Sequence, residues 1–240
     1  MSTSYDHKST TDEIRQRFDN DVERFSKLET GQVSTLDASL SLELITESAK
    51  RINPTATQIL DIGCGAGNYT LKMLSKIPNL NCTLIDLSKP MLDKAFERIA
   101  QKTEGEVIVV QSDIRDINLS SESYDIILAG AVLHHLRDDA DWEFVFNKLY
   151  NALKPGGSLW ISDLITQHNS IINTYIWETY GDYLEKIDGP VYRQKVLDYV
   201  EKEDSPRSLN FQFDLMKKVG FQEVEILHKN SCFAAYGAIK

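Results

Sequence analysis

The sequence has few of the residues that join distant parts of a chain covalently or through a metal ion. Its three cysteines, Cys64, Cys82 and Cys232, do not have the spacing of a metal site. Cys64 falls in a glycine-rich turn and Cys82 in a strand pattern, so both are predicted to be small packing residues. The cysteine pattern therefore predicts no metal site and a reducing environment.

Long apolar runs and an excess of positive charge are also missing. The first residues are polar and charged, and no apolar run approaches membrane-spanning length. Lysine and arginine number 26 against 36 aspartate and glutamate, a formal net charge of −10. Binding to nucleic acid needs clustered Lys and Arg, so this charge argues against a nucleic-acid partner, short of a local basic patch. These absences indicate a cytoplasmic protein with no membrane partner.

The most informative stretch is residues 59–70. A short, mostly apolar run predicts a buried strand that carries Asp61 near its carboxyl end, and a helical pattern follows a turn. The turn contains Gly63, Gly65 and Gly67. Strand, glycine turn and helix in this order build the nucleotide site of open α/β sheets. A dinucleotide motif would place its third glycine at position 68, which is Asn68, and the acid suits a cationic amine better than a pyrophosphate. The alternative is a glycine-rich turn without a ligand.

The rest of the chain alternates strands and helices. Further strands are expected at residues 82–87, 107–110, 124–130 and 158–164, and a hairpin at 224–239. Helices are expected at residues 12–28, with a break near Asp19, and at 36–52, with Leu40 buried; Phe96 is also expected to be buried. The pattern predicts an α/β protein in four parts. These are an N-terminal helical cap (1–55), a ligand-binding core (56–164), a helical insertion (165–207), and a helix with a β-hairpin that completes the core (208–240).

Acidic residues follow two of the predicted strands. Asp86 ends the second strand, 19 residues after Gly67, where a carboxylate can accept hydrogen bonds from both ribose hydroxyls of a nucleoside. Asp113 follows the third strand and is expected to accept from an adenine amino group, with Ile114 as an apolar contact for the ring. The alternative is that these are ordinary surface acids.

The order of these motifs resembles that of the class I S-adenosylmethionine (SAM) methyltransferases over residues 56–164 and 208–240. The similar pieces are the D-x-G-x-G-x-G motif at 61–67, Asp86, and residues 112–114, 132–136, 153–157 and 219–221. The resemblance implies a Rossmann-like seven-stranded sheet with an antiparallel seventh strand, and SAM as the cofactor. It assigns the glycine motif to the methionine end of SAM. The implied cofactor-binding residues are Asp61, Gly63, Cys64, Gly65, Gly67, Asp86, Leu87, Met91, Asp113, Ile114 and Ala129.

Within this family the sequence is similar to carboxy-SAM synthases and their methyltransferase relatives at Phe18-Asp19 and at residues 112–117 and 218–221. It departs from them in a His-His pair after the fourth strand and in having only Arg193 or Lys195 to grip the extra carboxylate. The main prediction is methyl transfer to a small-molecule N, O or S acceptor. The alternatives are carboxy-SAM synthesis linked to tRNA wobble uridine modification, and SAM binding without catalysis.

His134 and His135, just past the fourth strand, are the candidate catalytic residues. A hydroxyl acceptor needs a base, and histidine titrates near neutral pH. The alternative is that one ring packs and the other hydrogen-bonds to the backbone. A metal site is not predicted, because the sequence offers the pair no matching third and fourth ligands.

The insertion is rich in aromatic residues and helical in pattern, with a break at residues 188–190. We expect it to close over SAM and the acceptor as a mobile cover, with Phe18 and Phe25 of the cap as further wall residues. The alternative for both segments is simple packing. The predicted acceptor contacts are Tyr175, Trp177, Tyr180, Tyr192 and Arg193. A closed chamber favours a small acceptor over a folded protein or tRNA. The sequence leaves the oligomeric state open, with a homodimer among the alternatives.

Overall fold

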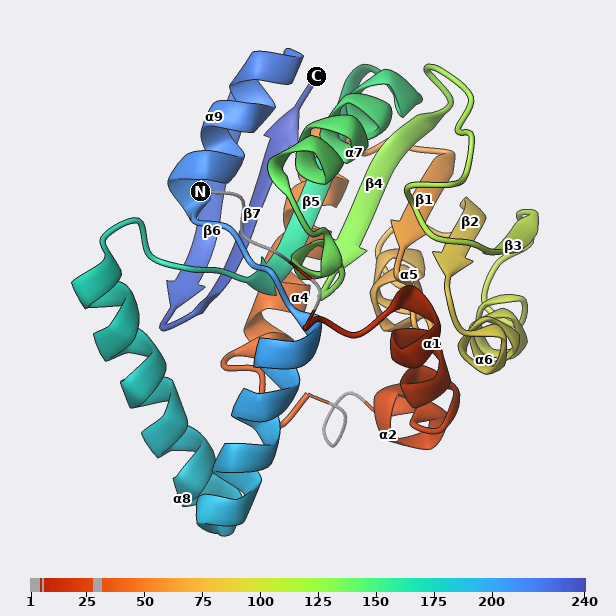
Figure 1. Ribbon diagram of the computed structural model, residues 1–240. Helices are drawn as coiled ribbons and strands as arrows, with labels where there is room; N and C mark the ends of the chain where they lie inside the picture. Colours follow the sequence, from red (N-terminus) through yellow and green to blue (C-terminus); the bar gives the residue numbers. More distant parts are fainter. Residues whose placement is uncertain (1–4, 6, 28–31) are drawn as a thin grey trace.

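The computed structural model describes residues 5, 7–27 and 32–240, and its centre is a seven-stranded sheet (Figure 1). The strand order is β3-β2-β1-β4-β5-β7-β6; the first five strands run parallel, and β7 lies antiparallel between β5 and β6. This confirms the predicted Rossmann-like sheet. The strands are β1 Gln58–Ile62, β2 Asn81–Asp86, β3 Val107–Gln111, β4 Tyr124–Gly130, β5 Leu153–Leu164, β6 Glu223–Asn230 and β7 Phe233–Ile239.

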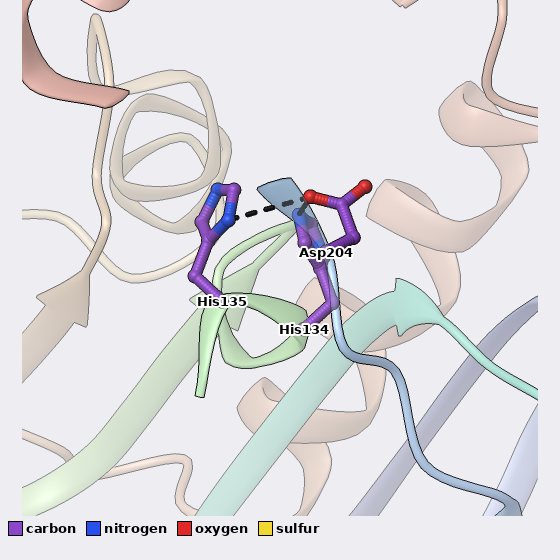
Figure 2. A group of neighbouring side chains, drawn as sticks. All are labelled: His134, His135 and Asp204. Carbon is purple, nitrogen blue, oxygen red and sulfur yellow. Dashed lines mark ion pairs between the residues drawn. The ribbon is translucent and has the colours of Figure 1, made fainter. Parts of the chain in front are cut away.

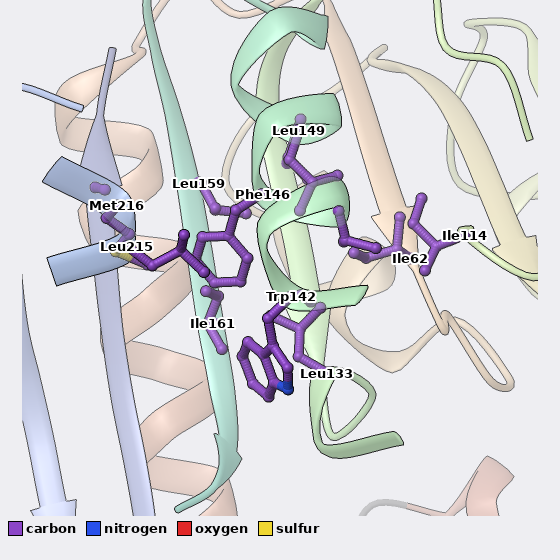
Figure 3. Packing of buried hydrophobic residues seen from close by; sticks show 14 of the residues in the cluster. Ile62, Ile114, Leu133, Trp142, Phe146, Leu149, Leu159, Ile161, Leu215 and Met216 are labelled. Carbon is purple, nitrogen blue, oxygen red and sulfur yellow. The ribbon is translucent and has the colours of Figure 1, made fainter. Parts of the chain in front are cut away.

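Helices cover both faces of the sheet, because its central strands are apolar on both sides. In β4, Ile126 packs with one layer and Ile127 with the other. One layer consists of α4 Ala38–Ile52, α5 Asn68–Leu74 and α6 Lys89–Ile99. The other consists of α7 Asp139–Ala152 and α9 Leu209–Val219, which pack through Trp142, Phe146 and Met216 (Figure 3). This two-sided burial leaves the ends of the strands as the place for a ligand.

Two burial predictions on the helices are wrong. Leu40 is 46% exposed and Phe96 is 45% exposed. The inward face of α6 is Leu92, Ala95 and Ile99, spaced by three and four residues, and Phe96 lies one residue beyond that face. Apolar character alone therefore did not locate the buried stripe.

Two short N-terminal helices lie against α6, near the carboxyl ends of β1 and β2 (Figure 1). Helix α1 Thr11–Asp19 begins with a reciprocal pair of hydrogen bonds between Thr10 and Glu13, and α2 Val22–Ser26 follows after Asn20 and Asp21. The expected break near Asp19 is present. Residues 1–4, 6 and 28–31 of the predicted cap, including the last position of its first helix, Leu28, lie outside the described residues.

The insertion is one helical hairpin, α8 Ser170–Glu203, whose two arms form a V away from the sheet (Figure 1). The arms separate at Asp188 and Gly189, which have non-helical backbone angles; Gly189 has φ +78°, a value that favours glycine. A Cβ on Gly181 of the first arm would lie 2.8 Å from Nε of Arg193 on the second, so the arms approach closely there. The predicted break is therefore in place.

Candidate functional site

The glycine turn between β1 and α5 leaves space at one of its three glycines. All three have positive φ: +60° at Gly63, +50° at Gly65 and +82° at Gly67. A Cβ on Gly63 would lie 2.4 Å from Val132, and one on Gly67 would lie 2.7 Å from Ile99. A Cβ on Gly65 would meet no heavy atom of a described residue within 4 Å. Gly65 is therefore where the turn faces open space.

Asp86 connects the end of β2 to this turn. Its Oδ2 accepts from the Gly65 N–H at 2.8 Å, and its Oδ1 accepts from the Ser88 N–H at 2.8 Å. Burial raises the pKa of the Asp86 carboxyl, and these backbone donors partly offset that effect. Each carboxylate oxygen keeps further acceptor capacity toward the space beside Gly65.

Asp61 lies underneath the turn. It is 1% exposed, and its Oδ2 accepts a hydrogen bond of 2.7 Å from the Thr70 hydroxyl on α5. Burial raises the pKa of the Asp61 carboxyl to about 7. The carboxylate thus joins β1 to α5, and its predicted role toward a cationic amine stays a prediction.

A small cavity of about 50 Å³ lies beside the turn, at the carboxyl ends of the strands. It is lined by Gly63, Ile85, Asp86, Leu87, Ser112, Asp113, Ile114, Arg115, Val132, His135 and Leu136. Predicted cofactor residues from three different loops therefore meet at one place. Three other predicted cofactor residues, Cys64, Met91 and Ala129, are buried and are not among the residues that line the cavity.

Arg115 is a site residue that the sequence analysis missed. Both oxygens of Asp113 accept from its guanidinium, Oδ1 from Nε at 3.0 Å and Oδ2 from Nη2 at 2.7 Å. Its Nη1 also pairs with Asp141 at 2.9 Å. Burial raises the pKa of Asp113, but the hydrogen bonds from Arg115 outweigh it and bring the pKa below its usual value. An adenine amino group must share Asp113 with Arg115 or displace it.

The histidine pair lies in the turn η1 Leu133–His135, after β4. His134 Nδ1 hydrogen-bonds to Oδ1 of Asp163 at the end of β5. His134 Nε2 is 3.5 Å, and His135 Nδ1 is 3.4 Å, from the same oxygen, Oδ1 of Asp204 (Figure 2). The ring centroids are 4.3 Å apart. The sequence analysis did not single out Asp163 or Asp204, because nothing near either acid in the sequence marks it as a partner of the pair.

The histidines and aspartates of this cluster shift one another's pKa values. Burial lowers the pKa of His134, but Asp163 and Asp204 outweigh it and raise that pKa to about 9. Burial, reinforced by the neighbouring His134, holds the pKa of His135 well below its usual value. Burial raises the pKa of Asp204 to about 6. His134 therefore carries the positive charge and His135 is neutral.

The cap and the insertion meet above His135. The ring of Phe18 lies edge-on to His135, with centroids 6.1 Å apart, and Phe18 also contacts Phe25. The Arg17 guanidinium lies 4.0 Å from the Phe18 ring and 4.1 Å from the Tyr199 ring, and its Nη2 pairs with Glu203 at 2.8 Å. These contacts tie α1 to the second arm of α8.

The predicted acceptor residues lie in the α8 hairpin and outside the lining that the described residues give the cavity. Tyr175 is 63% exposed; Tyr180 is 2% exposed and donates its hydroxyl to the Ser34 carbonyl. Arg193 pairs with Asp182 and Glu185 on the first arm. Trp177 and Tyr192 are partly buried and pack against the cluster formed by Leu164, Tyr180, Leu184 and Cys232. An open groove of about 710 Å³ instead follows the second arm, lined by Pro190, Val191, Gln194, Lys195, Asp198, Tyr199, Lys202 and Glu203.

Comparison with known proteins agrees with this geometry. Residues 59–157 match the model of a methyltransferase domain. Carboxy-S-adenosyl-L-methionine synthase from Cronobacter sakazakii is 25% identical over 207 residues, covering 83% of this chain and 81% of that protein. Malonyl-[acyl-carrier protein] O-methyltransferase from Priestia megaterium is 28% identical over 149 residues, covering 62% of this chain and 50% of that protein.

A solved structure extends the similarity of fold to nearly the whole chain. The 1,6-didemethyltoxoflavin-N1-methyltransferase of Burkholderia thailandensis aligns with a TM-score of 0.64 at 15% identity, covering 97% of this chain and 91% of that one. The sheet order, the glycine turn and these matches together support a class I SAM-dependent methyltransferase that uses SAM as its cofactor. Among the described residues, no helix is long and apolar enough to span a membrane.

Proposed function

We propose that the protein transfers the methyl group of SAM to a small-molecule acceptor bound beside His135. One observation carries the proposal: His135 lines the same cavity as Asp86 and the glycine turn. When bound, SAM supplies a methyl group on a sulfonium, so the protein must align an acceptor atom with it and exclude water.

The residues around the cavity suit the parts of SAM. Asp86 has acceptor capacity for the ribose hydroxyls, Asp113 with Ile114 suits the adenine, and the turn at Gly65 has room for the methionine part. Sites for ligands of this size usually measure about 300–1,000 Å³. The cavity of about 50 Å³ must therefore widen, and Arg115, which lines it and donates to the Thr11 hydroxyl of α1, would have to shift.

His135 is the better placed of the two candidate bases. His134 faces a carboxylate on each ring nitrogen. His135 Nε2 is buried and makes no hydrogen bond to a described residue, while its Nδ1 faces Asp204 and the Glu203 carbonyl. Two acceptors at Nδ1 favour the tautomer that leaves Nε2 free to accept a proton. His135 would then take the proton of a hydroxyl or protonated amine acceptor.

The covering elements support a small acceptor. Phe18 contacts the His135 ring, and Arg17 connects Phe18 to Tyr199, which also lines the groove along the second arm of α8. Carboxy-SAM synthesis is the second candidate, because synthases of that name are similar to the chain over most of their length. The buried, unpaired Cys64, Cys82 and Cys232 fit a cytoplasmic setting.

Two measurements test the proposal. Mass analysis of the ligand that co-purifies separates SAM and its demethylated product from carboxy-SAM. Purified protein is then incubated with SAM and a panel of small hydroxyl, amine and thiol acceptors, and methylated products are detected. His135→Ala should lower transfer to hydroxyl acceptors by about 10²–10⁴-fold without weakening SAM binding to the same extent. Bound carboxy-SAM would favour the second candidate, and SAM binding without transfer to any acceptor would favour a non-catalytic role.

A further inference from the structure

The structure supplies the histidine pair with a third potential metal ligand. The donor atoms are His134 Nε2, His135 Nδ1 and Asp204 Oδ1, and all lie within 4.8 Å of one another (Figure 2). His134 is 7% exposed and Asp204 is 4% exposed. The aspartate comes from the end of α8, so folding alone brings it to the pair.

The spacing of these atoms is poor for hydrogen bonds. The two nitrogen–oxygen distances are 3.5 and 3.4 Å. Good N–H···O bonds measure about 2.7–3.2 Å. Asp204 Oδ1 is buried without a hydrogen-bond partner among the described residues. The one hydrogen bond of His135 Nδ1 within that set is a long contact of 3.4 Å to the Glu203 carbonyl.

The same spacing suits a tetrahedral metal ion. Ligands about 2.0–2.1 Å from a zinc ion at tetrahedral angles lie about 3.3–3.4 Å from one another. Octahedral ligands at the same bond length would lie closer, at about 3.0 Å. The two nitrogen–oxygen distances, 3.5 and 3.4 Å, are close to the tetrahedral edge.

The surroundings of His134 also match those of a metal ligand. Histidines that bind a metal usually donate their other ring N–H to a carboxylate, which fixes the ring and its tautomer. His134 does this through Nδ1 to Asp163, whose oxygens also accept from the Leu133 and Leu164 N–H groups. The ring is therefore held with Nε2 directed at Asp204.

We propose that His134, His135 and Asp204 form a binding site for a divalent transition-metal ion of the zinc class. Three protein ligands leave the fourth tetrahedral position to water. The metal takes the lone pairs of His134 Nε2 and His135 Nδ1, so any proton on these two atoms leaves to solvent.

Metal binding would switch His135 off as a base; this step rests on the proposed function. A metal at Nδ1 requires the ring proton on Nε2, so the nitrogen that would otherwise accept a proton becomes a donor. The metal-free protein is then the form that can take a proton from an acceptor, and the metal-bound form is inhibited.

The site is tested on untagged protein stripped with a chelator. Zn²⁺ titrated against a chromophoric chelator should bind at one ion per chain with Kd below about 1 μM. Co²⁺ should give the intense visible absorption of a tetrahedral complex. Asp204→Ala and His135→Ala should each weaken Zn²⁺ binding at least about tenfold. The matched control is His228→Ala, which removes the other described His–Asp contact, a partly exposed pair of 2.8 Å with Asp37.

The outcomes separate the claims. Zn²⁺ binding weaker than about 1 μM by the unmodified protein overturns the metal site. So does Zn²⁺ binding that is lost in His228→Ala but kept in both Asp204→Ala and His135→Ala. If the site variants fail to fold, the Co²⁺ spectrum of the unmodified protein decides, and the absence of tetrahedral bands overturns the site. Methyl transfer by stripped protein should fall at least tenfold when Zn²⁺ is added; equal activity overturns the block on His135. If stripped protein methylates nothing, the proposed function fails while the titration still decides the site.

Discussion

The cavity beside the glycine turn and the histidine cluster share His135 but are assembled differently. The cavity is built by loops that directly follow β1, β2, β3 and β4, and the residues that form it lie next to recognisable strands. The histidine cluster needs Asp163 from the end of β5 and Asp204 from beyond the α8 hairpin. The first region is encoded locally and the second depends on the completed fold. Substitutions can test whether the two regions also separate in function.

The largest effect is expected in the locally encoded region. Gly65→Val should abolish detectable SAM binding, because the side chain enters the one open space at the turn and resists φ +50°. Calorimetry with SAM measures the effect. The matched control is Gly156→Val, another glycine with positive φ and open space, on β5 away from the cavity. Normal SAM binding by Gly65→Val would show that the turn does not face the cofactor.

A smaller loss is expected at the end of β2. Asp86→Ala should weaken SAM binding by about 1–3 kcal/mol, because the ribose hydroxyls and the Gly65 N–H lose their acceptor. Calorimetry and circular dichroism separate lost binding from lost fold. Asp93→Ala on α6 removes the same charge from an exposed pair with Lys89 and should leave the affinity unchanged. Equal affinity in the Asp86 and Asp93 variants would contradict the ribose assignment.

The contact between α1 and the second arm of α8 can be weakened at Arg17. In the native protein, we expect the demethylated product of SAM to protect residues 12–27 and 165–204 from hydrogen exchange, together with the glycine turn. Arg17→Ala removes the contacts of α1 with Tyr199 and Glu203, so this protection should fall in both segments and persist at the turn. Arg24→Ala, which breaks an exposed pair with Asp21, is the control. A response confined to the glycine turn in the native protein would make the insertion a static element.

The last prediction concerns the dependence of stability on pH, which changes gradually over about three pH units. Because the pKa of Asp61 is about 7 in the folded protein and about 3.9 in an unfolded chain, only the unfolded state is ionised between those values. In the absence of SAM, Asp61 should therefore contribute most to the free energy of unfolding below about pH 4, and this contribution should fall as the pH rises toward 7. Asp61→Asn keeps an acceptor for Thr70 but cannot ionise, so it should flatten the dependence of the free energy of unfolding on pH. The change in slope should be less than about 1.4 kcal/mol per pH unit, which is the limit for one proton. Denaturant curves at several pH values measure both slopes; identical slopes would contradict the burial of an ionisable group.

What could be predicted from the sequence divides in the same way, between features encoded locally and features that depend on the completed fold. The seven-stranded sheet with an antiparallel seventh strand could be predicted because the motif order of Asp61, Gly65 and Asp86 resembles that of the class I methyltransferases, which implies such a sheet. Arg115 was missed although it lies two residues from Asp113, because pairing between the two depends on the loop's shape. Asp204 could not be found, since its approach to His134 depends on the length and bend of α8. The predicted burial of Leu40 and Phe96 was wrong for a simpler reason. The buried face of a helix is narrow, so a shift of one residue along the sequence exposes a side chain.

The position of β7 has a consequence for biosynthesis. This strand pairs with β5 on one side and with β6 on the other, yet the ribosome makes it after every other strand of the sheet. Until residues 233–239 emerge, the nascent protein carries the edge of β5 with unpaired backbone groups and an apolar surface on either side. Such an edge is a template for pairing with another chain. Insertion of β7 between β5 and β6 therefore also closes this edge to pairing with other chains.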